Sequence, residues 1–177
     1  MTVGIVGAGV MGETLLAGLI RSGMPSTELL VAERRSERAA ELAEKYSVRV
    51  VDNATVAREA DTVVLLVKPQ DMANTLSEIS PTLHKDALVI SVAAGITTEF
   101  MEQNLPAGTR VVRSMPNTPA LVDQAMVAVS PGSKCTPDDL KVAEQLLSSV
   151  GKVLEVPEKY QDAVTAISGS GPAYIYY

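Results

Sequence analysis

The sequence is poor in the residue types on which several kinds of site depend. Its 177 residues include one cysteine, one histidine, no tryptophan, five tyrosines and one phenylalanine. A single cysteine, Cys135, excludes an internal disulfide and a thiolate metal cluster, and it fits a reducing compartment. No His, Asp or Glu spacing suggests a metal site, so we expect no bound metal.

Positive charge and long apolar runs are also scarce. Lys and Arg number 15 against 21 Asp and Glu, for a net charge of −6. Without a basic footprint or stacking aromatics, we expect no nucleic-acid partner. No apolar stretch approaches the length of a membrane span, and a strand-like run from Thr2 leaves no room for a signal peptide. We therefore expect a cytoplasmic protein that is neither secreted nor membrane-bound.

What the sequence does contain is a regular alternation of short β-branched runs and amphipathic segments. Six strands are expected: Thr2–Val6, Glu28–Ala32, Arg49–Val51, Thr62–Val67, Leu88–Val92 and Arg110–Ser114. Such alternation indicates parallel strands joined by right-handed crossovers. The nearly unbroken apolar run Thr62–Val67 is typical of a strand covered on both faces. The predicted fold class is doubly wound α/β with a mostly parallel sheet.

Capping residues mark several helices. Ser36 is expected to cap a helix that runs to Tyr46, Asn53 a short helix, and Thr136 a helix that Gly151 closes. No internal repeat and no linker rich in Gly, Ser or charge divides this part of the chain.

The tail differs from the rest. From about Tyr160 the pattern is helical, passes through Ser168-Gly-Ser-Gly-Pro172 and resumes as an apolar helix start at Ala173–Tyr177. Such an end without a partner would expose an apolar patch. We therefore expect residues 1–157 to form one domain and residues 158–177 to begin a helical domain whose remainder is absent.

A glycine pattern follows the first strand. Gly7-Ala8-Gly9-Val10-Met11-Gly12 places G-x-G-x-x-G between that strand and a helix. The first glycine permits a tight turn, the second lets the backbone approach a pyrophosphate, and the third allows close packing of the helix on the strand. Because Glu33 follows the second strand, where a ribose-reading acid belongs, the pattern predicts a dinucleotide-binding Rossmann fold.

Two arginines bear on the choice of dinucleotide. Glu33 could accept from the 2′-OH of NAD, whereas Arg34 and Arg35 could hold the 2′-phosphate of NADP. The alternative is that the arginines begin a solvated helix face. The pattern favours NADPH, with NADH possible.

Parallel topology places the loops after all six strands at one ligand edge. Besides the glycine loop they are Glu33–Arg35, Asp52–Asn53, Val67–Gln70, Ala93–Gly95 and Met115–Pro119. His84 falls at the opposite edge and is expected on the surface, and Cys135 is expected to be an unreactive loop residue. Lys68 is then the only obvious proton donor, and a plain surface lysine is its alternative role.

Several segments together resemble the pyrroline-5-carboxylate reductases. They are Gly7–Gly12, Val67-Lys-Pro-Gln70, Ser91-Val-Ala-Ala-Gly-Ile96, Arg113-Ser-Met-Pro-Asn-Thr-Pro119, Ser148-Ser-Val-Gly151 and Asp162-Ala-Val-Thr-Ala-Ile-Ser-Gly-Ser-Gly-Pro-Ala-Tyr174. The resemblance implies NAD(P)H-dependent reduction of 1-pyrroline-5-carboxylate to L-proline, with hydride transfer to the C5 carbon of the imine. A protonated imine is already electrophilic, so a site poor in acids is understandable.

The resemblance also implies roles for residues. The glycine loop would hold the pyrophosphate, and Arg34, Arg35 and Asn53 would lie at the adenosine end. The later loops would surround the nicotinamide, with Ser168–Ala173 on the substrate side. The expected cofactor residues are Gly7, Ala8, Gly9, Val10, Met11, Gly12, Glu33, Arg34, Arg35, Asn53, Val67, Lys68, Pro69, Ala93, Ala94, Gly95, Met115, Pro116 and Asn117. The catalytic candidates are Lys68 and, on the substrate side, Ser170.

The chain departs from the family in one respect. The family's helical C-terminal domain, which forms the dimer and supplies a Gly-Gly-x-Thr loop for the substrate carboxylate, is absent from this sequence. We expect the chain to bind cofactor but to be catalytically incomplete, and the full protein to be a homodimer or larger homo-oligomer. The alternatives are a non-catalytic NAD(P)H sensor and a β-hydroxyacid dehydrogenase, although the latter needs a catalytic lysine that Asp162–Tyr174 lacks.

Overall fold

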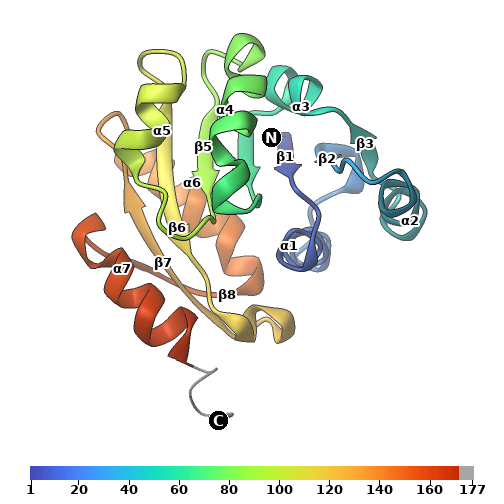
Figure 1. The fold of residues 1–177 in the computed structure, drawn as a ribbon. Helices are drawn as coiled ribbons and strands as arrows, with labels where there is room; N and C mark the ends of the chain where they lie inside the picture. Colours follow the sequence, from blue (N-terminus) through green and yellow to red (C-terminus); the bar gives the residue numbers. More distant parts are fainter. Residues whose placement is uncertain (172–177) are drawn as a thin grey trace.

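The strands expected from the sequence form one side of a larger sheet. The computed structural model describes residues 1–171 (Figure 1). Its strands are β1 (Val3–Val6), β2 (Leu29–Ala32), β3 (Arg49–Val51), β4 (Thr62–Leu65), β5 (Leu88–Ser91), β6 (Arg110–Met115), β7 (Ala125–Pro131) and β8 (Gly151–Glu155). The first six were predicted, with ends that differ by at most two residues.

The sheet order is β3-β2-β1-β4-β5-β6-β7-β8. Strands β1 to β6 run parallel, β7 runs antiparallel to β6, and β8 runs parallel to β7. This confirms the doubly wound, mostly parallel α/β fold. The sequence did not reveal β7 and β8. The side chains of β8 lie half-buried or exposed on the sheet edge, so this strand lacks the apolar run that marks the others.

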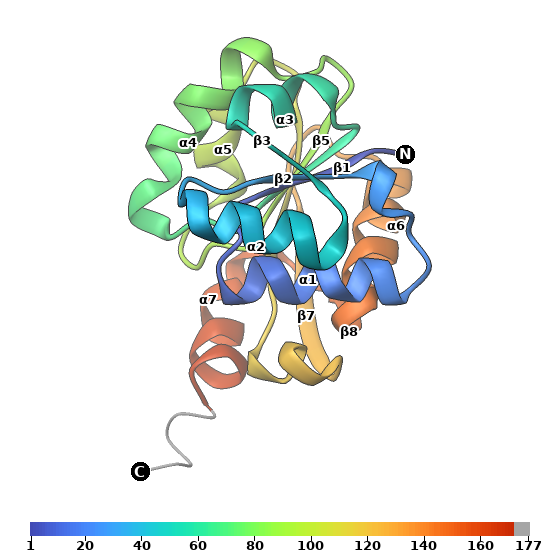
Figure 2. The same cartoon turned by 90° about the vertical axis from the view of Figure 1, so that its right-hand side faces the viewer.

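Helices cover both faces of the sheet. They are α1 (Val10–Arg21), α2 (Ser36–Tyr46), α3 (Asn53–Glu59), α4 (Met72–Ile79), α5 (Thr98–Asn104), α6 (Pro137–Leu147) and α7 (Gln161–Val164). Figure 2 shows the sheet nearly edge-on, with α1, α2 and α6 on one side and α3, α4 and α5 on the other. Along β4, Val64 joins the first core, whereas Val63 and Leu65 join the second. Both faces of β4 are therefore covered, as its apolar run predicted.

The helix caps agree with the sequence in part. Thr136 caps α6 in a reciprocal capping box with Asp139, as predicted. The expected cap at Asn53 is wrong, because the Asp52 carboxylate reaches the Thr55 amide (2.7 Å) and Asn53 is the first residue of α3.

The expected cap at Ser36 is also wrong. Arg35 occupies the cap position of α2 without a side-chain cap, and Ser36 is the first helical residue. The Arg35 amide is satisfied by the Glu33 carboxylate instead (3.0 Å). Gly151 ends the short helical extension of α6 and begins β8, where a Cβ would lie 2.2 Å from the Ala125 carbonyl oxygen.

A buried arginine fixes the start of α7 to the sheet. Arg113 on β6 is 4% exposed, and its guanidinium pairs with Glu158 (3.5 Å) and Asp162 (2.6 Å). Glu158 also accepts from the amide and hydroxyl of Thr98. After α7 the chain continues as a π-helical turn, Thr165–Gly169. The expected helix start at Ala173–Tyr177 lies outside the described residues.

Candidate dinucleotide-binding site

The first two crossovers place β2 and β3 on one side of β1, and the third places β4 on the other side. The strand order therefore reverses between β1 and β4, and ligands of doubly wound sheets bind at such a point. A hollow of about 340 Å³, here called the inner hollow, opens at the carboxyl ends of these strands. It is lined by Val6, Gly7, Ala8, Gly9, Ala32, Glu33, Arg34, Arg35, Asn53, Leu66, Val67, Lys68, Gln70, Asp71 and Thr75.

A second hollow of about 270 Å³, the outer hollow, adjoins the first. Its lining comprises Met11, Leu66, Val67, Lys68, Pro69, Val92, Ala93, Ala94, Met115 and Pro116. The two hollows share Leu66, Val67 and Lys68, so the loop after β4 separates them. Together their linings include residues that follow each of the six parallel strands, β1 to β6.

The glycines of the first loop differ in what surrounds them. Gly7 has a φ of +92°, and a Cβ there would lie 2.8 Å from the Leu66 carbonyl oxygen. A Cβ on Gly12 would lie 2.1 Å from the Gly7 carbonyl oxygen. Both residues must therefore be glycine for the loop to form.

Gly9 has no such internal reason to be glycine. A Cβ there would meet nothing within 4 Å, and its φ of −67° is open to any residue. The missing side chain leaves free space in front of α1, whose N-terminus has no side-chain cap. Exposed amides and the helix dipole at this point suit an anionic group such as a pyrophosphate.

Glu33 is held in place by its neighbour Arg35. Its side chain is 8% exposed, and it accepts from the Arg35 amide (3.0 Å), Nε (3.1 Å) and Nη2 (3.3 Å). Burial alone would raise the pKa of Glu33, but these hydrogen bonds outweigh it and the pKa is lowered. Glu33 is therefore a carboxylate at neutral pH.

The other two polar groups at this end converge on a residue that the sequence did not suggest. Arg34 Nη2 lies 2.8 Å from Glu78 Oε1, and Asn53 Nδ2 lies 2.5 Å from Glu78 Oε2. Glu78 belongs to the last turn of α4. No motif marks it, because only the packing of α4 beside α3 brings it to this edge.

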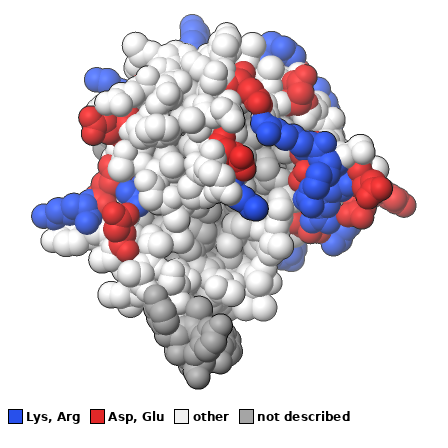
Figure 3. All heavy atoms as spheres, viewed as in Figure 1, with Lys and Arg blue, Asp and Glu red and all other residues white. Residues whose placement is uncertain are grey.

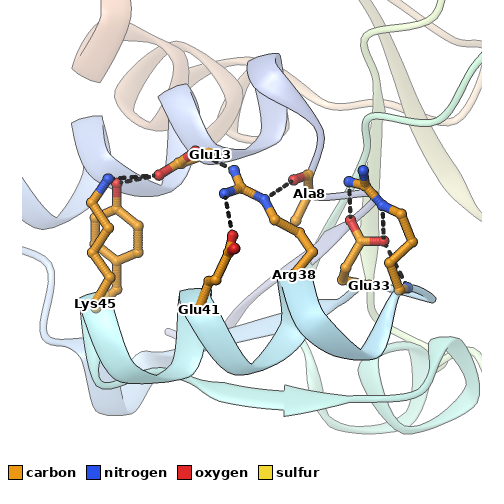
Figure 4. A network of polar contacts seen from close by, with 8 residues as sticks. Ala8, Glu13, Glu33, Arg38, Glu41 and Lys45 are labelled. Carbon is orange, nitrogen blue, oxygen red and sulfur yellow. Dashed lines mark hydrogen bonds and ion pairs between the residues drawn. The ribbon is translucent and has the colours of Figure 1, made fainter.

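A polar network holds the glycine loop from behind (Figure 4). Arg38 on α2 donates to the Ala8 carbonyl oxygen (3.5 Å) and pairs with Glu13 on α1. Glu13 also accepts from Lys45 Nζ and from the Tyr46 hydroxyl, both at 2.9 Å. The hydrogen bond from Lys45, helped by Arg38 and Tyr46 and opposed by burial, lowers the pKa of Glu13 to about 2.

The loop after β6 contacts the segment that follows α7. Asn117 Nδ2 donates to Ser168 Oγ (3.0 Å), and a Cβ on Gly169 would lie 3.0 Å from Met115 Cε. Lys68 is exposed between the two hollows. Ser170 lines neither hollow, and its amide donates to the Thr165 carbonyl at the end of the π-helical turn (2.8 Å).

Most of the expected cofactor residues meet at this edge. Val10, Gly12, Gly95 and Asn117 are the expected residues that line neither hollow. Seven further residues line the hollows. Gln70 lies in the expected loop Val67–Gln70, and the sequence missed Val6, Ala32, Leu66, Asp71, Thr75 and Val92. Their positions at strand ends could have suggested Val6, Ala32, Leu66 and Val92, whereas Asp71 and Thr75 lie at the start of α4 and carry no sequence signal.

The residues excluded by topology lie elsewhere. His84 is exposed in the connection from α4 to β5, at the opposite edge of the sheet. Cys135 lies between β7 and α6, where its thiol donates to the Val111 carbonyl oxygen (2.9 Å) and burial raises its pKa.

The surface charge is unevenly spread. Figure 3 shows a dense group of charged side chains on the α2 side of the molecule, whereas the middle of the face turned toward the viewer is largely uncharged.

A parallel sheet with a glycine loop at its switch point and an acid after the second strand defines a dinucleotide-binding Rossmann domain. Residues 2–95, more than half of the chain, match the family model "NADP oxidoreductase coenzyme F420-dependent". The pyrroline-5-carboxylate reductase of Methanosarcina acetivorans is 43% identical over 98% of this chain and 65% of its own length.

Solved structures agree with this. The chain superposes on a pyrroline-5-carboxylate reductase from Coxiella burnetii with a TM-score of 0.94 and 34% identity, over 99% of this chain and 66% of that one. For the Plasmodium falciparum pyrroline carboxylate reductase with NADP bound, the TM-score is 0.88 and the identity 29%, over 99% and 65%. The chain therefore belongs to the pyrroline-5-carboxylate reductase family and corresponds to the N-terminal portion of its members. It spans about 65% of the length of these relatives.

No helix among residues 1–171 is both long enough and apolar enough to cross a membrane.

Proposed function

We propose that this chain is the cofactor-binding part of a reductase that converts 1-pyrroline-5-carboxylate to L-proline with NADPH, the last step of proline biosynthesis. The observation that carries the proposal is the 43% identity to a pyrroline-5-carboxylate reductase over 98% of the chain. The free space in front of Gly9 and the uncapped start of α1 support the binding of a pyrophosphate there.

The remaining cofactor contacts follow from the two hollows. The inner hollow, with Glu33, Arg34, Arg35 and Asn53, would take the adenosine end. The outer hollow, with Lys68 and Pro69, Ala93 and Ala94, and Met115 and Pro116, would take the nicotinamide. The Plasmodium relative with NADP bound and the two arginines beside Glu33 support NADPH over NADH.

The proposed reaction needs little acid or base catalysis from the protein. When bound, the cofactor supplies a hydride to the imine carbon. A protonated ring imine is already electrophilic, so the protein contributes mainly by holding donor and acceptor in contact. Lys68, exposed between the hollows, is the nearest candidate for a proton donor, and the contact between Asn117 and Ser168 brings the Ser168–Ser170 segment toward the nicotinamide side.

The substrate side and the assembly are part of the same proposal. We place a domain boundary near residue 157 because β8 ends at Glu155 and the chain then leaves the sheet as helix. The second domain would complete the substrate site and form a homodimer or larger homo-oligomer. We place the enzyme in the cytoplasm, because its one cysteine is a free thiol.

The test is NADPH oxidation after addition of 1-pyrroline-5-carboxylate. It compares the 177-residue chain with a form extended through the C-terminal third that the relatives carry. We expect both forms to bind NADPH and only the extended form to oxidise it. If the extended form binds NADPH and NADH but oxidises neither in the presence of this imine, the proposed reaction is wrong.

A further inference from the structure

The donor groups at the adenosine end of the inner hollow are already engaged by two carboxylates of the chain itself. Arg35 is bound by Glu33 through three hydrogen bonds, whereas Arg34 and Asn53 are both bound by Glu78. An anion that approached this end would therefore meet three residues that each already donate to a carboxylate of the chain. It would compete with that carboxylate for the N–H groups that face it.

The two carboxylates differ in how firmly they are held. Glu33 is 8% exposed and also accepts a backbone amide, so it forms part of the loop's own structure. Glu78 is 46% exposed and makes its two contacts to side chains only, reaching them from α4. Thr75, one turn earlier on α4, lines the hollow, so Glu78 stands at its rim. Glu78 is the one that a ligand could displace.

The geometry of the Glu78 contacts is that of an anion site. A guanidinium and an amide donate to the two oxygens of one carboxylate, at 2.8 and 2.5 Å. The same donor types bind phosphate oxygens, and guanidinium does so with particular strength. A 2′-phosphate carries more negative charge than a carboxylate, but it competes with Glu78 for these two donors, and the nearby carboxylate repels it.

We propose that Glu78 is a specificity-determining residue, whose carboxylate occupies the anion position formed by Arg34 and Asn53 and competes there with the 2′-phosphate of NADPH. NADH has no 2′-phosphate and does not need to displace Glu78. Glu78 therefore weakens NADPH binding relative to NADH binding and reduces the preference for NADPH. The inference rests on the adenosine placement in the proposed function, but it does not depend on the imine substrate.

The test is the dissociation constants of NADPH and NADH for the 177-residue chain and its Glu78→Gln variant, measured by titration at fixed salt. Because an exposed ion pair is weak, we expect Glu78→Gln to tighten NADPH binding by about two- to fivefold and to leave NADH binding unchanged. Glu78→Ala, which removes both contacts, should change NADPH binding in the same direction.

Glu59→Gln is the matched control. It changes the net charge equally, but the partners of Glu59, Arg49 (3.0 Å) and Arg58 (3.7 Å), line neither hollow, whereas those of Glu78 line the inner hollow. We expect it to alter neither dissociation constant. In an Arg34→Ala background the effect of Glu78→Gln should shrink, because one of the two competing donors is gone.

Three results would overturn the inference. Weaker NADPH binding in both Glu78 variants would mean that Glu78 orients Arg34 for the phosphate. Equal changes in the dissociation constants of NADPH and NADH would mean that only the shape of the hollow matters. An equal gain in NADPH affinity in Glu59→Gln would mean that only the overall charge matters. A chain that binds the cofactors as expected but belongs to a protein inactive toward 1-pyrroline-5-carboxylate would refute the proposed reaction and leave the role of Glu78 standing.

Discussion

Gly7, Gly9 and Gly12 show that one motif can combine two different requirements. Gly7 and Gly12 are needed by the fold, because a side chain at either would collide with a backbone carbonyl oxygen. Gly9 is not needed by the fold, because its missing side chain leaves only open space. Substitutions at Gly7 or Gly12 should therefore lower stability, whereas a substitution at Gly9 should weaken cofactor binding and leave stability nearly unchanged.

Gly9→Leu should abolish most NADPH binding and preserve the fold. The side chain would fill the space in front of α1, and we expect a loss of affinity of at least about tenfold with a change in unfolding free energy below about 1 kcal/mol. Gly12→Ala is the contrasting variant and should lower the melting temperature itself. Thermal unfolding and NADPH titration of both variants check this, and unchanged affinity in Gly9→Leu would refute the pyrophosphate site.

At the scale of elements, Glu13 joins α1 to α2 just behind the glycine loop. Its carboxylate accepts hydrogen bonds from Arg38, Lys45 and Tyr46, which all lie on α2. Arg38 also donates to the Ala8 carbonyl oxygen (Figure 4). Three donors from one helix on a single carboxylate fix the two helices relative to each other. The position of the loop between β1 and α1 depends on that arrangement.

Glu13 should make stability depend on pH in the acid range. Its pKa is lowered to about 2 in the folded protein from 4.5, so the unfolded chain binds more protons between these values. The contribution is complete above about pH 4.5 and is lost as the pH falls toward about 2.

Urea unfolding at several pH values checks this dependence. We expect Glu13→Gln to flatten the acid slope, and Lys45→Met to reduce it in part, because the Lys45 hydrogen bond is the largest cause of the shift. The effect should be modest, since the Lys45 side chain is 63% exposed and solvent screens its pairing with Glu13. An acid slope identical in Glu13→Gln and the parent chain would contradict the role of this network.

At the scale of the whole molecule, one apolar area stands out on the β7, β8 and α7 side. Met126, Leu154, Tyr160 and Ile167 are 43%, 56%, 51% and 77% exposed, and they line a shallow hollow of about 270 Å³. Apolar patches of this kind mark surfaces that meet a partner. The chain spans 65–66% of the length of its relatives, and we expect the additional segment that they carry to cover this area.

Ile167→Ser should therefore keep the 177-residue chain monomeric to higher concentration with little change in stability. The side chain is 77% exposed, so its loss removes an attractive surface and no core contact. Val122→Ser is the control, because Val122 is 69% exposed but does not line the hollow. Light scattering over a concentration series measures the outcome, and equal self-association of both variants and the parent would refute it.

The parts of the site that the sequence revealed are those defined by local chemistry. The G-x-G-x-x-G motif and the acid after the second strand can be recognised in the sequence alone, because the role of each depends on its own backbone or on a residue close in the chain. The parts that it missed depend on packing. Glu78 reaches Arg34 and Asn53 only because α4 lies beside α3, and Asp52 displaces Asn53 as a cap because its carboxylate has the right reach to the Thr55 amide.

The sequence by itself determined the fold class, the first six strands and the sheet edge that gathers the loops after them, because these follow from hydrophobic periodicity and chain direction. Only the tertiary structure decided that β7 reverses direction against β6, that β8 closes the sheet, and which carboxylate meets which donor around the inner hollow. An edge strand carries little apolar signal, and a side-chain hydrogen bond between residues 25 or 44 positions apart has no local signature at all. Such contacts exist only once the sheet has brought distant segments to one edge.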